Sequence, residues 1–204
     1  ADVGLVGFPN AGKSSLLAAI SRATPEVAAY PFTTLHPQLG VVHPRPEASF
    51  TVADIPGLLD GAHANRGLGH AFLSHVERTS LLCYVLDLAA DVHPIAQLAA
   101  LRRELDLYLP GLSARRCVVV GNKADQPDVA ERLKHLRADV ALRAAAGDMP
   151  GLVEPKSGAS RVTAVSAAER RNLDVVVQRL HEALALDEAA ELGGDKAANA
   201  EIVV

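Results

Sequence analysis

A phosphate-binding motif stands near the start of the sequence. Residues 7–14 fit the pattern G-x-x-x-x-G-K-[ST] and read Gly7-Phe8-Pro9-Asn10-Ala11-Gly12-Lys13-Ser14, followed by Ser15. In such a loop, consecutive backbone N–H groups wrap a phosphate at the positive end of the next helix, and glycines remove the crowding of Cβ atoms. We expect Lys13 to reach the β and γ phosphates and the Ser14 hydroxyl to bind Mg²⁺.

A second motif, Asp54-Ile55-Pro56-Gly57, directly follows the apolar stretch Phe50–Ala53. A carboxylate at the end of a strand can hold Mg²⁺ through water, and the N–H of Gly57 can sense the γ-phosphate. A D-x-x-G tetrapeptide in isolation is usually an ordinary turn. Its position one strand after a phosphate loop favours the nucleotide-binding interpretation.

A third motif can select the base. Asn122-Lys123-Ala124-Asp125 follows the apolar stretch Cys117–Gly121. The carboxylate of Asp125 can accept from both the N1–H and the exocyclic amine of guanine, whereas adenine lacks this donor pair and would leave the carboxylate unpaired. The stem of Lys123 can lie along the base, and Asn122 can tie this loop to the phosphate loop.

A fourth segment, Ser166-Ala167-Ala168, can offer backbone N–H groups to the guanine O6. The four segments occur in order, each at the C-terminal end of an expected strand, which is where ligands bind in open α/β sheets. The sequence therefore predicts a guanine-nucleotide site that takes GTP or GDP with Mg²⁺.

The elements that must position these motifs alternate between short apolar stretches and longer helical patterns, as in βαβ units. Strands are expected at Val3–Gly7, Leu39–Val42, Phe50–Ala53, Leu81–Leu88, Cys117–Gly121 and Arg161–Val165. Helices are expected at Lys13–Ala23, Gly69–Thr79, Pro94–Leu109, Val129–Ala146 and Leu173–Leu186. We predict a doubly wound α/β domain of the P-loop type with a mostly parallel sheet, covering residues 1–187, and a linker or disordered tail at 188–204.

Two segments without clear periodicity, Thr24–Gln38 and Gly57–Gly69, are expected to be loops that order around the γ-phosphate. A third, Gly147–Ser160, is expected to be an insertion loop without identified chemistry.

The composition excludes several classes of protein. A net charge of -4 provides no general basic field, and 3% aromatic residues argue against a base-stacking surface for single-stranded nucleic acid. The longest apolar run, Ser80–Ala90, contains Asp87 and is too short to span a bilayer, so we expect no membrane partner, and we expect a monomer. Cys83 and Cys117 are expected to be buried small hydrophobes.

Further stretches carry a family resemblance. They are Tyr30-Pro31-Phe32-Thr33-Thr34-Leu35, Gly57-Leu58-Leu59-Asp60-Gly61-Ala62-His63, Gly67-Leu68-Gly69-His70-Ala71-Phe72-Leu73 and His75-Val76-Glu77-Arg78-Thr79. Together with the first ten residues they resemble the G domain of the Obg family of ribosome-assembly GTPases. The resemblance implies that Thr34 joins Ser14 and Asp54 on Mg²⁺, with Thr33 as the alternative, and that Phe32 lies in the same nucleotide-binding loop. Lys13, Thr34 and Gly57 would then act in catalysis.

The resemblance also implies a biological role. The partner would be the large ribosomal subunit or its assembly intermediate, with its ribosomal RNA and proteins. Gly111-Leu112-Ser113-Ala114-Arg115 and Asn65-Arg66-Gly67-Leu68-Gly69 look most like the mitochondrial members, which implies the mitochondrial matrix; a bacterial or organellar equivalent is the alternative. A GTP-dependent placeholder, in which hydrolysis serves only release from the particle, is the alternative function. An ATP-using relative is another, against which Asp125 argues.

Three residues bear on hydrolysis. Leu58 occupies the position where Ras-like GTPases carry a glutamine, and an aliphatic side chain cannot orient water, so slow hydrolysis is expected. Asn10 has two open interpretations: relatives with this asparagine use it to hold K⁺ beside the phosphates, or its side chain stabilises the loop turn. His63 can help to place water or can be a solvated loop residue.

Overall fold

The structure is a computed structural model, and it describes residues 1–27, 38–54, 79–155 and 159–200. A seven-stranded sheet has the order β2-β3-β4-β1-β5-β6-β7. Its strands are β1 (Val3–Val6), β2 (Glu26–Val27), β3 (Gln38–Arg45), β4 (Ala48–Asp54), β5 (Leu81–Asp87), β6 (Cys117–Asn122) and β7 (Val162–Ala164). The expected strands are all present, within a few residues of their expected ends, and only β2 was not expected from the sequence.

The five strands from β4 to β7 in this order run parallel, and β2 and β3 pair antiparallel at one edge. The carboxyl ends of the parallel strands therefore meet at one edge of the sheet, where the four sequence motifs begin. This arrangement confirms the predicted doubly wound, mostly parallel α/β fold.

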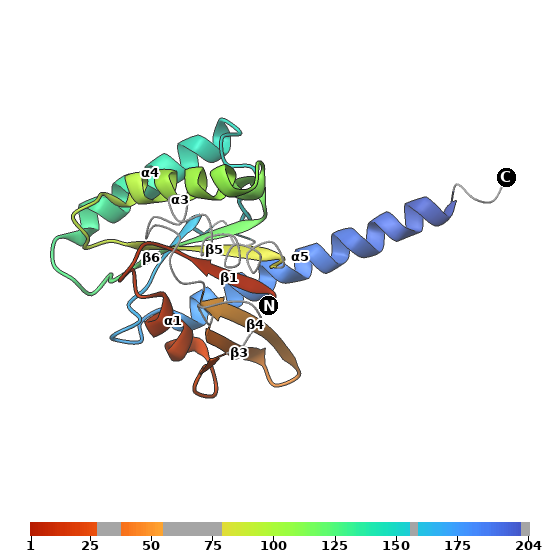
Figure 1. Ribbon diagram of the computed structural model, residues 1–204, viewed down its shortest axis with the longest axis horizontal. Helices are drawn as coiled ribbons and strands as arrows, with labels where there is room; N and C mark the ends of the chain where they lie inside the picture. The colour runs from red at the N-terminus through yellow and green to blue at the C-terminus, as the bar shows by residue number, and fades with distance from the viewer. Residues whose placement is uncertain (28–37, 55–78, 156–158, 201–204) are drawn as a thin grey trace.

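Helices cover both faces of the sheet (Figure 1). They are α1 (Lys13–Ile20), α3 (Pro94–Tyr108), α4 (Val129–Ala145) and α5 (Leu173–Ala200), with a short 3₁₀ helix, η1 (Leu112–Ala114). Helices α3 and α4 lie on one face, and α1 and α5 lie on the other. The expected helix at 69–79 lies almost wholly outside the described residues.

The residues of strand β5 explain why helices must cover both faces of the sheet. Alternate residues point to opposite sides of a strand. Leu82, Tyr84 and Leu86 enter the core under α3 and α4, whereas Leu81 and Cys83 enter the core above α1 and α5. Every residue of β5 is buried, which explains why the sequence shows a continuous apolar run in place of an alternating one.

Helix α5 packs against the sheet through Val176, Leu180 and Ala183, which have no exposed surface. Its backbone remains helical to Ala200 and leads away from the sheet (Figure 1). The backbone of residues 188–200 is thus a helical continuation of α5, and the linker or disordered tail expected at 188–204 stays a prediction. Alanine, leucine and glutamate favour helix strongly enough to outweigh Gly193 and Gly194. That the domain ends near residue 187 stays a prediction.

The insertion expected at 147–160 has a packing role in its first half. Val153 donates a backbone hydrogen bond to Cys117 at 2.9 Å, and Cys117 donates to Gly151 at 2.7 Å. Met149 and Val153 are buried against the core. These residues cover the start of β6.

Candidate functional site: a nucleotide-binding edge of the sheet

The phosphate loop connects β1 to α1 and depends on its glycines. Gly12 caps the amino end of α1 with φ +87°, a left-handed conformation that L side chains rarely adopt. A Cβ atom on Gly12 would collide with Nδ2 of Asn122, and one on Gly7 would collide with the backbone oxygen of Val85. The loop backbone therefore lies against two neighbouring strands, as the motif requires.

Lys13 folds over this loop. Its Nζ donates to the backbone oxygens of Gly7 at 3.1 Å and Phe8 at 3.2 Å, and the residue is only 8% exposed. The ammonium group thus lies against the start of the phosphate loop, whose N–H groups would surround a phosphate. Asn10 is exposed at the tip with φ +62°, a conformation that asparagine tolerates better than most residues. Pro9 and Ser15 are exposed, and Ala11 is buried beneath the loop.

The two described candidate ligands of Mg²⁺ lie side by side. The Ser14 hydroxyl donates a hydrogen bond to Oδ2 of Asp54, 40 residues further along the chain. Asp54 is 5% exposed, and its Oδ1 is buried without a hydrogen-bond partner in the part of the chain that the structure describes. A buried, incompletely bonded carboxylate beside a hydroxyl suits a hard divalent cation, which prefers oxygen ligands. The residues present therefore fit Mg²⁺.

Asn122 joins three segments of the site. Its Nδ2 donates to the backbone oxygen of Ala11 at 2.9 Å, and its Oδ1 accepts from the backbone N–H of Ala167 at 3.1 Å. The side chain is 2% exposed. The hydrogen bond from Asn122 to the phosphate loop, expected from the sequence, is present. The hydrogen bond with Ala167 was not expected.

Asp125 ends the loop Asn122–Asp125, here called the base loop, and is partly exposed. Hydrogen bonding by the Ser166 side chain and by the Gln126 amide lowers the pKa of Asp125 below its ordinary value. The Gln126 amide donates to Oδ2 at 2.6 Å. An ionised carboxylate accepts on both oxygens and can therefore accept the paired donors of guanine. Ser166 is buried and Ala168 is exposed, at the end of the segment that follows β7.

The remaining expected site residues, Phe32, Thr33, Thr34 and Gly57, lie outside the described residues, as do Leu58 and His63. Of the expected set, the structure brings together the phosphate loop, Asp54 and the two segments expected to contact the base, Asn122–Asp125 and Ser166–Ala168. Sequence analysis missed Asp87 as a site residue. Its Oδ2 accepts from Nζ of Lys123 at 2.6 Å. The signal in the sequence was a lone acid at the end of an otherwise apolar strand.

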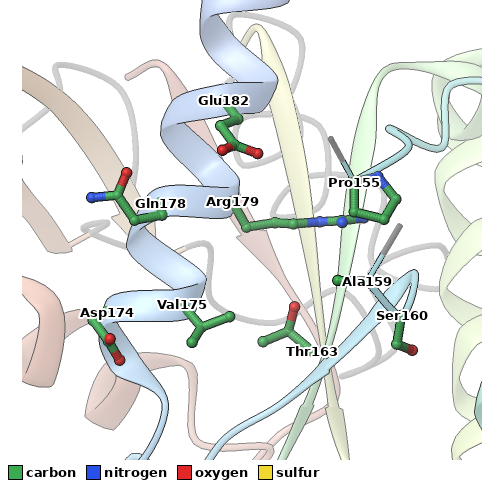
Figure 2. A pocket seen from close by; sticks show the side chains of 9 residues that line it. All are labelled: Pro155, Ala159, Ser160, Thr163, Asp174, Val175, Gln178, Arg179 and Glu182. Carbon is green, nitrogen blue, oxygen red and sulfur yellow. The ribbon is translucent and has the colours of Figure 1, made fainter. Parts of the chain in front are cut away.

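A cavity of about 260 Å³ lies elsewhere, between β7 and α5. Arg179 extends from α5 across it above Thr163 (Figure 2). The guanidinium donates to the backbone oxygen of Val153 at 2.8 Å, and burial lowers the pKa of Arg179. None of the residues that line this cavity belongs to the four motifs, so we assign Arg179 a structural role in fastening the loop before β7 to α5.

In the described parts of the chain, no helix combines the length and apolar character needed to cross a bilayer. The fold and the site together define a P-loop GTPase domain. The model of one protein family, described as "50S ribosome-binding GTPase", matches residues 2–123. The chain belongs to this family.

Similar proteins agree with the Obg resemblance. The chain is 48% identical over 187 residues to "GTPase Obg" of Roseiflexus castenholzii, covering 90% of this chain and 39% of that protein. It is 54% identical over 137 residues to "Mitochondrial ribosome-associated GTPase 2" of Homo sapiens, covering 67% of this chain and 34% of that protein. The chain thus spans well under half the length of these two curated relatives.

Solved structures support the fold. The G domain of the Thermotoga maritima FeoB iron transporter superimposes with a TM-score of 0.58 at 22% identity, covering 89% of this chain and 96% of that one. A point variant of Aquifex aeolicus Era bound to GDP and AlF4⁻ gives a TM-score of 0.58 at 22% identity, covering 87% of this chain and 55% of that one.

Proposed function

We propose that this chain binds GTP with Mg²⁺, hydrolyses it slowly, and acts as a switch in assembly of the large ribosomal subunit. The observation that carries the nucleotide assignment is the position of Asn122. One side chain connects the loop that would hold the phosphates with both segments that would hold the base. A nucleoside phosphate whose base donates hydrogen bonds to Asp125 would contact all three segments at once.

In the bound state the backbone N–H groups of residues 7–14 and Lys13 would surround the β and γ phosphates. To do so, the Lys13 ammonium exchanges its contacts with the Gly7 and Phe8 oxygens for phosphate oxygens. Asp125 would accept from the guanine N1–H and amine. Of the segment 166–168, the N–H of Ala168 would face O6, because the N–H groups of Ser166 and Ala167 already donate to Arg171 and Asn122. Because adenine offers no such donor pair, it would leave the Asp125 carboxylate without partners, and affinity would fall.

Ser14 and Asp54 would hold Mg²⁺, and Thr34 would join them when GTP is present. When bound, this ion would neutralise charge on the β and γ phosphates. Ser14 and Asp54 are already in contact with each other, so binding requires the hydroxyl to turn from the carboxylate toward the ion. We propose Gly57 as the backbone donor that senses the γ-phosphate.

We propose slow hydrolysis because Leu58 has no group that orients water. Asn10 is placed at the exposed tip of the phosphate loop, where a bound K⁺ could replace an arginine finger. The test compares single-turnover GTP hydrolysis in KCl and NaCl. Equal rates in both salts would remove the K⁺ proposal. A rate near the roughly 5–20 s⁻¹ of activator-stimulated Ras enzymes would contradict slow hydrolysis.

The ribosomal role rests on the relatives, one of which is named as a mitochondrial ribosome-associated GTPase. We propose a monomer acting on the large subunit or its precursor in the mitochondrial matrix. A placeholder whose hydrolysis serves only release is the second candidate, supported by the same expectation of slow hydrolysis.

Two experiments test the proposal. Calorimetry with GDP and ADP should show binding of the guanine nucleotide and at least about a hundredfold weaker binding of ADP; equal binding, or none, would overturn the nucleotide assignment. Sedimentation of the full-length protein with ribosomal subunits, in GTP and in GDP, tests the partner. A variant that binds GTP without hydrolysing it should stay on the large subunit if hydrolysis serves release, and absence from the large subunit in both nucleotides would contradict the ribosomal role.

A further inference from the structure

Asp87 contacts the base loop although it belongs to none of the four motifs. It ends β5, is 6% exposed, and uses both carboxylate oxygens. Oδ2 accepts from Nζ of Lys123 at 2.6 Å, and Oδ1 accepts from the backbone N–H of Ala89 at 2.8 Å. The Lys123 side chain is 36% exposed, so part of it remains accessible while its ammonium group contacts Asp87.

Gln97 of α3 fixes the backbone of Asp87. The N–H of Asp87 donates to Oε1 of Gln97 at 3.0 Å, and its C=O accepts from Nε2 at 2.8 Å. Nε2 also donates to the oxygen of Val92 at 2.8 Å, and Gln97 has no exposed surface. A buried amide with these three hydrogen bonds has one available orientation, because turning it over would place its oxygen against the two carbonyl oxygens and its NH₂ group against the Asp87 N–H.

The sheet register places Asp87 beside the base loop. Asp87 is the partner of Asn122 across the parallel strands β5 and β6, and Leu88 donates to the oxygen of Asn122 at 3.0 Å. Lys123 then turns the chain with φ +64°. The carboxylate therefore stands where the side chain leaving this turn can reach it.

We propose that Asp87 is a positioning residue for guanine-nucleotide binding: it holds the Lys123 ammonium so that the stem of Lys123 is already set along one face of the base. This inference rests on the proposed function. A lysine has large rotamer freedom, and freedom removed before the ligand arrives is not lost again on binding. The gain in nucleotide affinity would not depend on the guanine N1–H and amine, which are the groups that Asp125 would bind.

The alternative is that Asp87 only stabilises the turn at Ala89. Asp87→Asn separates the two roles, because asparagine has the same shape and retains an oxygen for the Ala89 N–H. Its amide would face the Lys123 ammonium and repel it. Asp91→Asn is the matched control: the same change in charge, four residues away, at an exposed position.

The measurement is the dissociation constant of GDP and of IDP, which lacks the exocyclic amine. Asp87→Asn should weaken both nucleotides by the same factor, roughly three- to tenfold, whereas Asp91→Asn should leave both within about twofold of the unmodified chain. The melting temperature of the nucleotide-free variant shows whether the domain remains folded. Unchanged affinity in a folded Asp87→Asn variant would overturn the inference.

A double-mutant cycle tests whether Asp87 acts through Lys123. In a Lys123→Met background, Asp87→Asn should cause no further loss of GDP affinity, since the ion pair is already gone. An equal loss in both backgrounds would show that Asp87 acts independently of Lys123 and would overturn the inference. Failure of the proposed function looks different: the unmodified chain itself would not prefer GDP to ADP.

Discussion

Asn122 and Ala11 are 111 positions apart in the sequence and are joined by a hydrogen bond of 2.9 Å from the asparagine amide to the alanine carbonyl. The same amide group accepts from Ala167. One buried side chain thus connects the base loop, the phosphate loop and the segment after β7. A shift of one of these segments would disturb the hydrogen bonds to the others, which couples recognition of the base to recognition of the phosphates.

Replacing Asn122 with alanine should uncouple these loops. Two buried backbone groups would lose their partners, which should lower the free energy of unfolding by about 2–4 kcal/mol and weaken GDP binding by at least about tenfold. Chemical denaturation and calorimetry measure the two effects. Gln178→Ala removes an exposed amide that makes one long hydrogen bond of 3.3 Å and should change neither. Wild-type affinity in a folded Asn122→Ala variant would contradict the coupling.

Asp125 should retain guanine selectivity in mildly acidic solution. Its pKa lies below the ordinary value because Ser166 and Gln126 stabilise the ionised form. A lowered pKa in the folded state means that the carboxylate stays charged as the pH falls, and that its contribution is lost only below the ordinary aspartate range. The preference for GDP over ADP should be constant from pH 7 to about pH 5. A preference that disappears over this interval would show that another group reads the base.

Loss of the Ser14 hydroxyl should raise the Mg²⁺ concentration that GTP binding requires. In Ser14→Ala the hydroxyl that contacts Asp54 is lost, and the Mg²⁺ concentration for half-maximal GTP binding should rise by about tenfold. Titration of Mg²⁺ at fixed nucleotide concentration measures this shift. Ser80→Ala, at an exposed position before β5, provides the control. Identical Mg²⁺ titrations for both variants would remove Ser14 from the ion's ligands.

The two cysteines should be unreactive in the folded protein. Both are free and fully buried, and burial raises the pKa of Cys83 to about 12 and that of Cys117 to about 11. Because the thiolate is the reactive form, a thiol reagent at pH 8 should label neither until denaturant is added, and then should label both. Rapid labelling of the native chain would contradict the packing of β5 and β6.

Leu101 tests the core beneath α3. It has no exposed surface, so Leu101→Ala should lower the free energy of unfolding by about 2–5 kcal/mol. Leu142→Ala makes the same change on α4 at a position that is 71% exposed, and should stay within about 0.5 kcal/mol. Denaturant titrations of both variants provide the comparison, and similar losses would show that α3 does not pack as described.

The sequence by itself determined the strands, the helices and the four loops of the site. These follow from local rules: glycine where the phosphate loop turns, alternation of apolar stretches with helical patterns, and a motif at the carboxyl end of four of the five parallel strands, β5 being the exception. Local rules missed β2, which is two residues long. They also gave no sign that the backbone of residues 188–200 is helical, where helix-forming residues outweigh two glycines.

Only the tertiary structure decided which side chains meet. Asp87 and Lys123 are 36 positions apart, and nothing in either stretch identifies the other as its partner. Sheet register sets Asp87 opposite Asn122, and Gln97 of α3 then fixes the backbone of Asp87 through its N–H and C=O. Composition and spacing specify the elements, whereas a salt bridge between distant residues depends on how strands align, and that alignment arises only when both faces of the sheet are packed.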